Sequence, residues 1–211
     1  RPTRAFLSAL GIAIGIAAMI AVVGISASSR AQLSAQLDSL GTNLLTASAG
    51  QDLFGNKSSL PEDSVGKVRL INQVEQASST GLIKNSLVYR SPLIDKNASG
   101  GLSTMVADQS LLDVVAGEVD KGTWLNQATS QYPATVLGAA AAQRLGVVSP
   151  GTQVWIGGKW FTVVGILKPV VLAPDLDSAA LVGKQAATSL LGYDSKPTTV
   201  YTRIQDKSVA S

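Results

Sequence analysis

The chain has 211 residues and a nearly balanced charge, with 17 lysines and arginines against 14 acidic residues and a net charge of +3. Its lack of cysteine excludes a disulfide framework and thiolate chemistry, and its lack of histidine removes the commonest zinc ligand and general base. Two basic residues, Arg1 and Arg4, precede the first hydrophobic segment, which leaves 15 basic and 14 acidic residues in the remainder. Because that remainder lacks a basic footprint, we expect no nucleic-acid partner.

Residues 5–29 form an uninterrupted run of 25 residues without charge. As a helix this run is about 37 Å long, which exceeds the hydrocarbon core of a bilayer at roughly 30 Å. It predicts a transmembrane helix over residues 1–28. Through the positive-inside rule, Arg1 and Arg4 predict a cytoplasmic N-terminus and an extracytoplasmic main domain at the cell membrane. The small residues at 26–29 also resemble a signal-peptide cleavage site, so a secreted protein is the alternative.

Small residues within this segment indicate a packing surface. Gly11 and Gly15 have the GxxxG spacing that lets two membrane helices approach closely, and we predict that they pack against another membrane helix. The alternative is an ordinary lipid-facing composition.

The helical pattern continues beyond the apolar run. Leu33, Leu37 and Leu40 recur at helical spacing, and Gly41 follows them as a C-terminal glycine. We predict a stalk helix over residues 29–41, about three turns long, with the three leucines as its packing face. A short helix folded against the following domain is the other interpretation.

Residues 42–211 alternate short strand patterns with short helical patterns, separated by glycine, proline and asparagine. This succession predicts a mixed α+β fold, built either as one compact domain or as two lobes. We expect residues 74–84 and 86–94 to be paired strands. The predicted strands cover residues 43–48, 74–84, 86–94, 102–107, 134–137, 152–156, 159–167, 178–182 and 198–204. The predicted helices cover residues 61–71, 109–116, 138–145 and 184–191.

The clearest hairpin joins residues 152–156 to 159–167 through Gly157-Gly158, a two-residue loop suited to a primed turn. In that register Trp155 faces Trp160 across the strands. The two tryptophans are candidates for an exposed surface that binds an apolar substrate or a partner protein. The alternative is a cross-strand pair that only stabilises the hairpin.

The acidic residues do not form a catalytic pattern. Asp175 and Asp177, like Glu118 and Asp120, are carboxylates two residues apart without further ligands, a spacing typical of solvated turns and strands. We therefore expect no catalytic residue, no metal site and no cofactor, and predict that the chain is not an enzyme.

Several sequence blocks resemble a known family. The run Leu40-Gly-Thr-Asn-Leu-Leu45 after a membrane helix and stalk is similar to the start of the MacB-like periplasmic core domain, a part of FtsX-like ABC transporter permeases. A second block is more specific: Ala134-Thr-Val-Leu-Gly138, an alanine helix ending in Leu145-Gly146, and a hairpin closing on Phe161-Thr-Val-Val-Gly-Ile-Leu167. Between them, residues 117–125 resemble the family's "GR.L" stretch, with Lys121 where arginine is frequent.

The resemblance implies a permease subunit whose extracytoplasmic domain performs no chemistry. It implies a lipid bilayer, a cytoplasmic ABC ATPase subunit and a second permease copy or homologue as partners. Movement driven by ATP hydrolysis would pass along the stalk to export a substrate or to signal mechanically outside the membrane. Because this family normally continues into further membrane helices, the chain is expected to be a fragment. The alternative from the residues alone is a stand-alone membrane-anchored or secreted binding or adhesion module.

Overall fold

The computed structural model describes residues 11, 13–17, 19, 20, 24, 28, 29, 43–50, 58–95 and 100–205. Contacts divide the chain into two units, Arg1–Thr42 and Asn43–Ser211. In the first unit, the described residues are helical. None of the helices in the described ranges is both long and apolar enough to cross a membrane. The predicted stalk residues Leu33, Leu37 and Leu40 lie outside the described residues.

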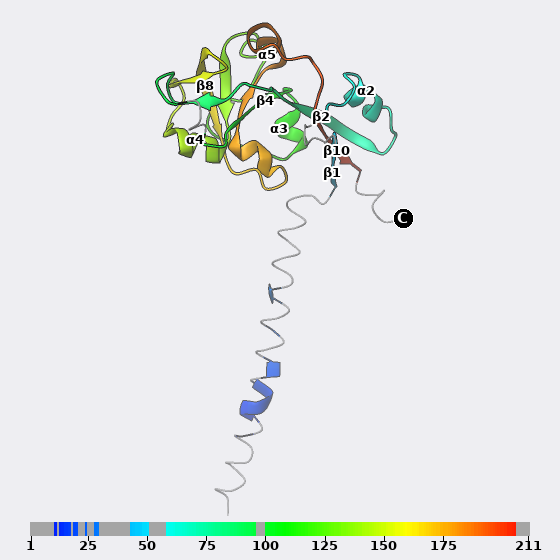
Figure 1. Cartoon of the computed structure of the whole chain (residues 1–211). Helices are drawn as coiled ribbons and strands as arrows, with labels where there is room; N and C mark the ends of the chain where they lie inside the picture. Colours follow the sequence, from blue (N-terminus) through cyan, green and yellow to red (C-terminus); the bar gives the residue numbers. More distant parts are fainter. Residues whose placement is uncertain are drawn as a thin grey trace, which may run out of the picture. The chain divides into compact units, whose positions relative to one another are not determined.

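The second unit is built on one mixed sheet (Figure 1). Its strands follow the order β1-β10-β2-β4-β9-β6-β8-β7-β3, and β5 pairs with β8 beside that path. The β4–β9 and β6–β8 pairs are parallel, and the others are antiparallel. The strands are β1 (Leu44–Ser48), β2 (Val74–Leu82), β3 (Val88–Tyr89), β4 (Ser103–Ala107), β5 (Val119–Gly122), β6 (Ala134–Leu137), β7 (Gln153–Ile156), β8 (Lys159–Leu167), β9 (Ala179–Val182) and β10 (Thr199–Ile204).

Short helices connect these strands. They are α2 (Ser64–Arg69), α3 (Leu111–Val114), α4 (Ala139–Leu145), α5 (Lys184–Leu191) and the 3₁₀ helix η1 (Pro174–Ser178). Both α4 and α5 end at a glycine in the left-handed conformation, Gly146 at φ 64° and Gly192 at φ 68°. Glycine adopts this conformation without the steric cost that a Cβ atom brings, so each helix stops where its glycine stands.

The sheet has a hydrophobic core on each face. In the first core, α4 and α5 pack against one face of the sheet, and this core includes Ile156, Phe161 and Val163. In the second core, α3 and η1 pack against the other face, and this core includes Leu111, Leu176 and Leu181. Every residue of β6 and β9 is buried, as expected for central strands covered on both sides.

Most predicted elements after residue 43 are confirmed, with ends shifted by a few residues. One strand pairing was wrong. Of residues 86–94 only Val88–Tyr89 forms a strand, and it pairs with β7 rather than with 74–84. The reason is that β2 is already bonded on both sides near its end, to β10 and to β4, so no edge is left for a hairpin partner. Strand β5 and helix η1 were not predicted at all.

Candidate functional site

An aromatic row crosses three strands at the β3 edge of the sheet. Tyr89 of β3 stands opposite Trp155 of β7, and Trp155 stands opposite Trp160 of β8, which confirms the predicted register of the two tryptophans. Residues opposite one another in an antiparallel pair share a face, so all three rings lie on one side of the sheet. Their neighbours Val88, Ile156 and Lys159 point to the other side, where Val88 and Ile156 enter the first core.

The tryptophan rings contact each other edge to face. Their centroids are 5.2 Å apart and their planes meet at 74°, a favourable arrangement for two aromatic rings. Trp155 is half-buried, whereas 42% of Trp160 remains exposed. The contact therefore contributes to the hairpin and still leaves aromatic surface open to a ligand.

A groove of about 300 Å³ adjoins this row. Its lining is mostly apolar, and part of it comes from the loop that follows β3. Leu87 and Ile94 are partly exposed there, and Leu93 is 93% exposed beside them. The lining residues are Asn85, Leu87, Tyr89, Pro92, Ile94, Trp155, Gly157 and Gly158. We call this surface, together with Trp160 and Leu93, the aromatic groove.

The turn at Gly157-Gly158 positions the groove. Gly157 has φ 54°, and a Cβ atom on it would lie 2.6 Å from a methyl carbon of Leu191 and 2.9 Å from the Ser86 hydroxyl oxygen. Glycine is needed at this position both for the backbone conformation and for the close approach of α5. The end of α5 therefore packs directly against the hairpin turn that lines the groove.

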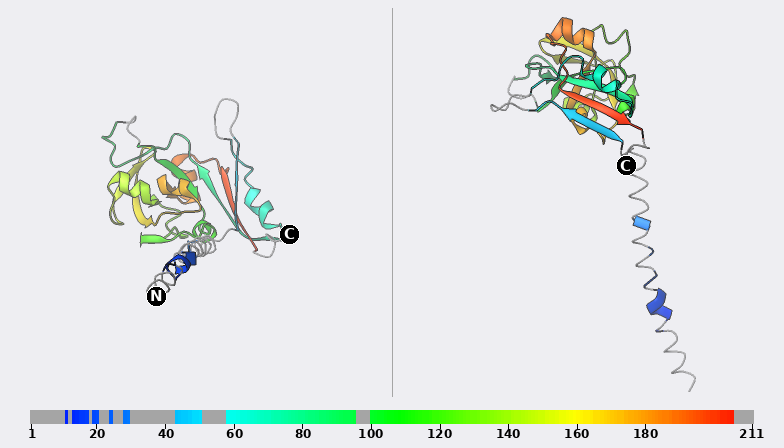
Figure 2. Two further views of the ribbon diagram at one scale, coloured as in Figure 1. Left: turned by 90° about the horizontal axis from the view of Figure 1, so that it is seen from below. Right: turned by 90° about the vertical axis from the view of Figure 1, so that its right-hand side faces the viewer.

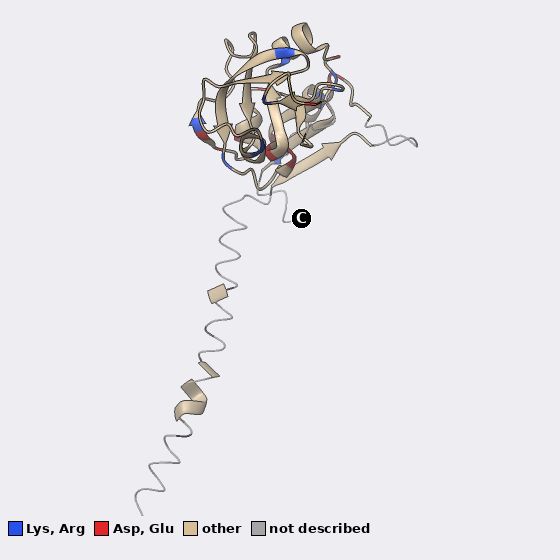
Figure 3. Cartoon of the chain, turned by 60° about the vertical axis from the view of Figure 1, so that its left-hand side comes forward, with Lys and Arg blue, Asp and Glu red and all other residues tan. Residues whose placement is uncertain are grey.

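Charged residues occur on several elements of the described part of the domain. Figure 3 shows lysine, arginine, aspartate and glutamate scattered over several elements rather than gathered in one block. Glu118 and Lys168 form an exposed ion pair with 2.6 Å between the carboxylate oxygen and the ammonium nitrogen. The hydrogen bond from Lys168, and then its charge, lower the pKa of Glu118, and the same contacts raise the pKa of Lys168.

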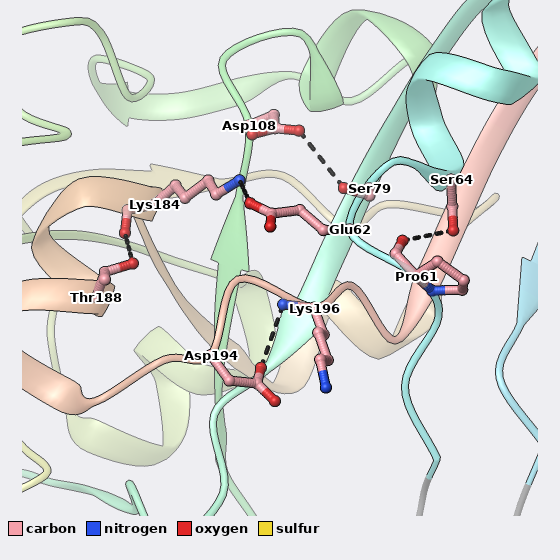
Figure 4. A network of polar contacts seen from close by, with 9 residues as sticks. All are labelled: Pro61, Glu62, Ser64, Ser79, Asp108, Lys184, Thr188, Asp194 and Lys196. Atoms are coloured by element: carbon pink, nitrogen blue, oxygen red, sulfur yellow. Dashed lines mark hydrogen bonds and ion pairs between the residues drawn. The ribbon is translucent and has the colours of Figure 1, made fainter.

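A second, polar cleft of about 230 Å³ is lined by Asp108 and Lys184, among others. Figure 4 shows that Lys184 pairs with Glu62 at 3.2 Å and that Asp108 accepts a hydrogen bond from Ser79 at 3.5 Å. Lys184 thus ties the start of α5 to the segment before α2, and Asp108 ties the loop after β4 to β2.

The acidic pairs considered from the sequence have structural contacts. Asp177 accepts a hydrogen bond from the Val170 amide at 2.9 Å, and Asp175 lies in the same short helix η1. Within the part of the chain that the structure describes, no three acidic side chains gather as a metal-binding group.

The predicted helix-packing glycines belong to the first unit. Gly11 and Gly15 are exposed on the helical segment of the first unit, and a Cβ atom on either would meet nothing within 4 Å. Tyr89 and the loop residues of the groove were not predicted from the sequence. The available signal was the apolar run Pro92-Leu93-Ile94.

The fold is that of extracytoplasmic domains of ABC transporters. The extracellular domain of the noncanonic ABC-type transporter YknZ from Gram-positive bacteria aligns with a TM-score of 0.56 and 19% identity, over 79% of this chain and 86% of that one. The periplasmic region of MacB from Actinobacillus actinomycetemcomitans aligns with a TM-score of 0.57 and 13% identity, over 79% of this chain and 77% of that one. At these identities the likeness concerns the fold alone.

Sequence relatives point to the same class. The macrolide export ATP-binding/permease protein MacB of Chlorobaculum tepidum is 29% identical over 152 residues, 67% of this chain and 22% of that protein. Its namesake in Nitrobacter winogradskyi is 25% identical over 202 residues, 92% of this chain and 30% of that protein. The chain thus spans less than a third of the length of these relatives. Fold and relatives together define a domain of an ABC transporter permease.

The family profile of the MacB-like periplasmic core domain matches residues 5–210. The chain therefore belongs to the MacB-like periplasmic core domain family, as its sequence blocks predicted.

Proposed function

We propose that the chain is the first membrane helix and extracytoplasmic domain of an ABC permease subunit, which couples cytoplasmic ATP hydrolysis to substrate export or to mechanical signalling outside the membrane. The observation that carries the proposal is the extent of the family match. It begins at residue 5 and therefore includes the uncharged run as well as the sheet domain. The domain itself is proposed to be non-catalytic.

The membrane helix is supported by the exposed side chains of the first unit. Ile14, Ile16, Met19 and Ile20 are each more than half exposed on a helical segment. Apolar side chains in such a series are stable only where lipid or another helix covers them. On this proposal Arg1 and Arg4 favour a cytoplasmic N-terminus by the positive-inside rule, Gly11 and Gly15 would pack on a neighbouring membrane helix, and residues 29–41 would form the stalk.

The proposed partners are a cytoplasmic ABC ATPase subunit and a second permease copy or homologue. The names of the relatives join ATP binding and permease in one protein, which supports an ATPase as the source of energy. We propose that the ATPase is a separate polypeptide here, so that it should copurify with the full-length permease as a distinct band. The aromatic groove is the proposed surface for an apolar substrate or an extracytoplasmic partner.

Topology can be tested with single cysteines, because residues 1–211 contain none and any cysteine in the rest of the full-length permease can be replaced by serine. A single cysteine replaces Thr3 in one variant of the full-length permease and the exposed Ser59 in another, and intact cells are treated with a membrane-impermeant maleimide. We expect labelling of Ser59→Cys in intact cells and labelling of Thr3→Cys only after permeabilisation. Labelling of both in intact cells, or cleavage of the chain before residue 31, would refute the proposed membrane helix.

The role of the groove can be separated from hairpin stability. Trp160→Ala in the assembled complex should abolish the stimulation of ATP hydrolysis by substrate or partner while basal hydrolysis persists. Tyr132→Ala is the matched control, because Tyr132 is an exposed aromatic residue outside the groove lining. If Trp160→Ala lowers only the melting temperature and leaves stimulation intact, the tryptophans serve the hairpin alone.

A further inference from the structure

The first residue of the sheet domain, Asn43, is joined to the last strand by three hydrogen bonds. The side-chain amide nitrogen of Asn43 donates to the carbonyl oxygen of Ile204 at 2.8 Å. Its side-chain oxygen accepts from Arg203 at 3.2 Å, and its backbone oxygen accepts from the Ile204 amide at 3.0 Å. Asn43 is only 8% exposed, so these groups have little water to replace a lost partner.

Arg203 extends the tie into the second core. Its Nε and Nη2 atoms donate to the carbonyl oxygen of Val114 at 3.2 and 3.0 Å, while Nη1 holds Asn43. Val114 ends α3 and is itself fully buried in the second core. The planar guanidinium thus joins the start of the domain, the end of the domain and its interior in one rigid group. We call Asn43, Arg203, Ile204 and the Val114 carbonyl the latch.

The latch lies at the end of the β1–β10 ladder where both chain connections meet the domain. Strands β1 and β10 are antiparallel neighbours, with Leu44 opposite Arg203, and Figure 2 shows them side by side in its right-hand view. The chain therefore enters β1 and leaves β10 at the same end of their ladder. A force on either connection acts on that end first and separates an antiparallel ladder one pair at a time.

Strand β1 would be the first to yield without the latch. It is an edge strand bonded only to β10 along the strand path of the described residues, and four of its five residues are exposed. Its packing therefore offers little resistance to peeling. The latch lies at the pair where peeling would begin. Two side-chain hydrogen bonds hold Asn43 to β10 there, and two more anchor Arg203 itself to the Val114 carbonyl.

We propose that the latch makes the two connections of the sheet domain a single mechanical unit, so that ATP-driven displacement moves the domain as a rigid body and β1 does not peel from β10. This inference rests on the proposed function, and assigns Asn43 and Arg203 as positioning residues for it. Neither residue is proposed to touch a substrate.

Hydrogen exchange in the full-length complex with its ATPase tests the latch. Asn43→Ala should accelerate exchange of the Ile204 amide, which bonds the Asn43 carbonyl, by at least about tenfold, because two hydrogen bonds are lost, one of them to a charged group. Amides of the first core should keep their protection. Arg144→Ala is the matched control, since it removes an arginine bond to a carbonyl, that of Gly100, elsewhere on the domain. Unchanged exchange at Ile204 in Asn43→Ala would overturn the latch.

The mechanical role has its own readout. During ATP turnover, exchange at Ile204 should rise further in Asn43→Ala and stay constant in the wild type, an effect that a purely structural bond would not produce. A disulfide between Asn43→Cys and Ile204→Cys, directly opposed positions, should abolish the rise, and reductant should restore it. Exchange that is independent of turnover in Asn43→Ala would overturn the inference. A wild-type complex that binds no ATPase would instead refute the proposed function.

Discussion

Gly138 connects β6 to α4, and its replacement by alanine should destabilise the domain severely. A Cβ atom there would lie 2.0 Å from the carbonyl oxygen of Leu176 and 2.5 Å from that of Asp177. Both obstacles are backbone atoms of η1, which a change of rotamer cannot move. The separation must open from 2.0 Å to at least 3.4 Å before ordinary contact returns, so η1 has to shift away from α4.

The cost of that shift can be estimated from what η1 carries. Leu176 is fully buried in the second core, and Asp177 bonds the Val170 amide, so displacement disturbs both. Overpacking of this kind costs about 3 kcal/mol, the upper part of its usual range, because the neighbours are backbone. For a domain of this size that free energy lowers the melting temperature by roughly 6–12 °C.

Gly66→Ala is the control, and its expected change in stability is opposite to that of Gly138→Ala. Gly66 lies within α2, and a Cβ atom on it would meet nothing within 4 Å. Alanine there should stabilise the protein by about 0.5–1 kcal/mol, because it restricts the unfolded chain. Thermal unfolding followed by circular dichroism measures both variants. A melting temperature for Gly138→Ala within a degree or so of the wild type, or an equal loss in Gly66→Ala, would refute the reasoning.

Two further predictions concern ionisation, and one concerns the hairpin. Because the pKa of Glu118 is lowered, its ion pair stabilises the folded state at pH values above the ordinary pKa of glutamate, and this stabilisation is lost as the pH falls through the lowered pKa. In Lys168→Met, an NMR titration should show the Glu118 carboxyl returning to its ordinary pKa. Burial raises the pKa of Tyr193, so the folded state should lose stability as pH rises above the ordinary pKa of tyrosine, and Tyr193→Phe should remove that loss in alkaline unfolding experiments. Trp160→Ala should cost about 0.5–1.5 kcal/mol in chemical denaturation through the lost ring contact, and a larger loss would contradict its partial exposure.

Local signals account for the parts of the fold that sequence analysis predicted. The Gly157-Gly158 turn fixes the register of β7 and β8, and with it the opposition of Trp155 and Trp160. Gly146 and Gly192 end α4 and α5 where the helical patterns end. In each case the deciding interactions join residues close in sequence.

The errors and omissions concern residues whose partners are distant. Strand β3 pairs with β7 across more than sixty residues, and its two residues carry no local pairing signal. The position of Tyr89 beside Trp155 therefore could not be predicted from the sequence, and neither could the groove. Asn43 was noticed only as part of a family resemblance, because its side chain bonds a residue 161 positions away.

The sheet topology gives the latch and the aromatic groove a physical connection. Along the strand path, β1 forms one edge and β3 the other, and every step between them is a hydrogen-bonded pair. The central strands β6 and β9 are wholly buried, so the middle of the sheet resists bending because its side chains are packed on both faces. On the proposed function, displacement that enters at β1 and β10 reaches the groove through this sheet and requires no flexible loop between them. The groove should therefore move with the chain connections while its own geometry stays constant, which is the behaviour expected of a surface that delivers force to a bound partner.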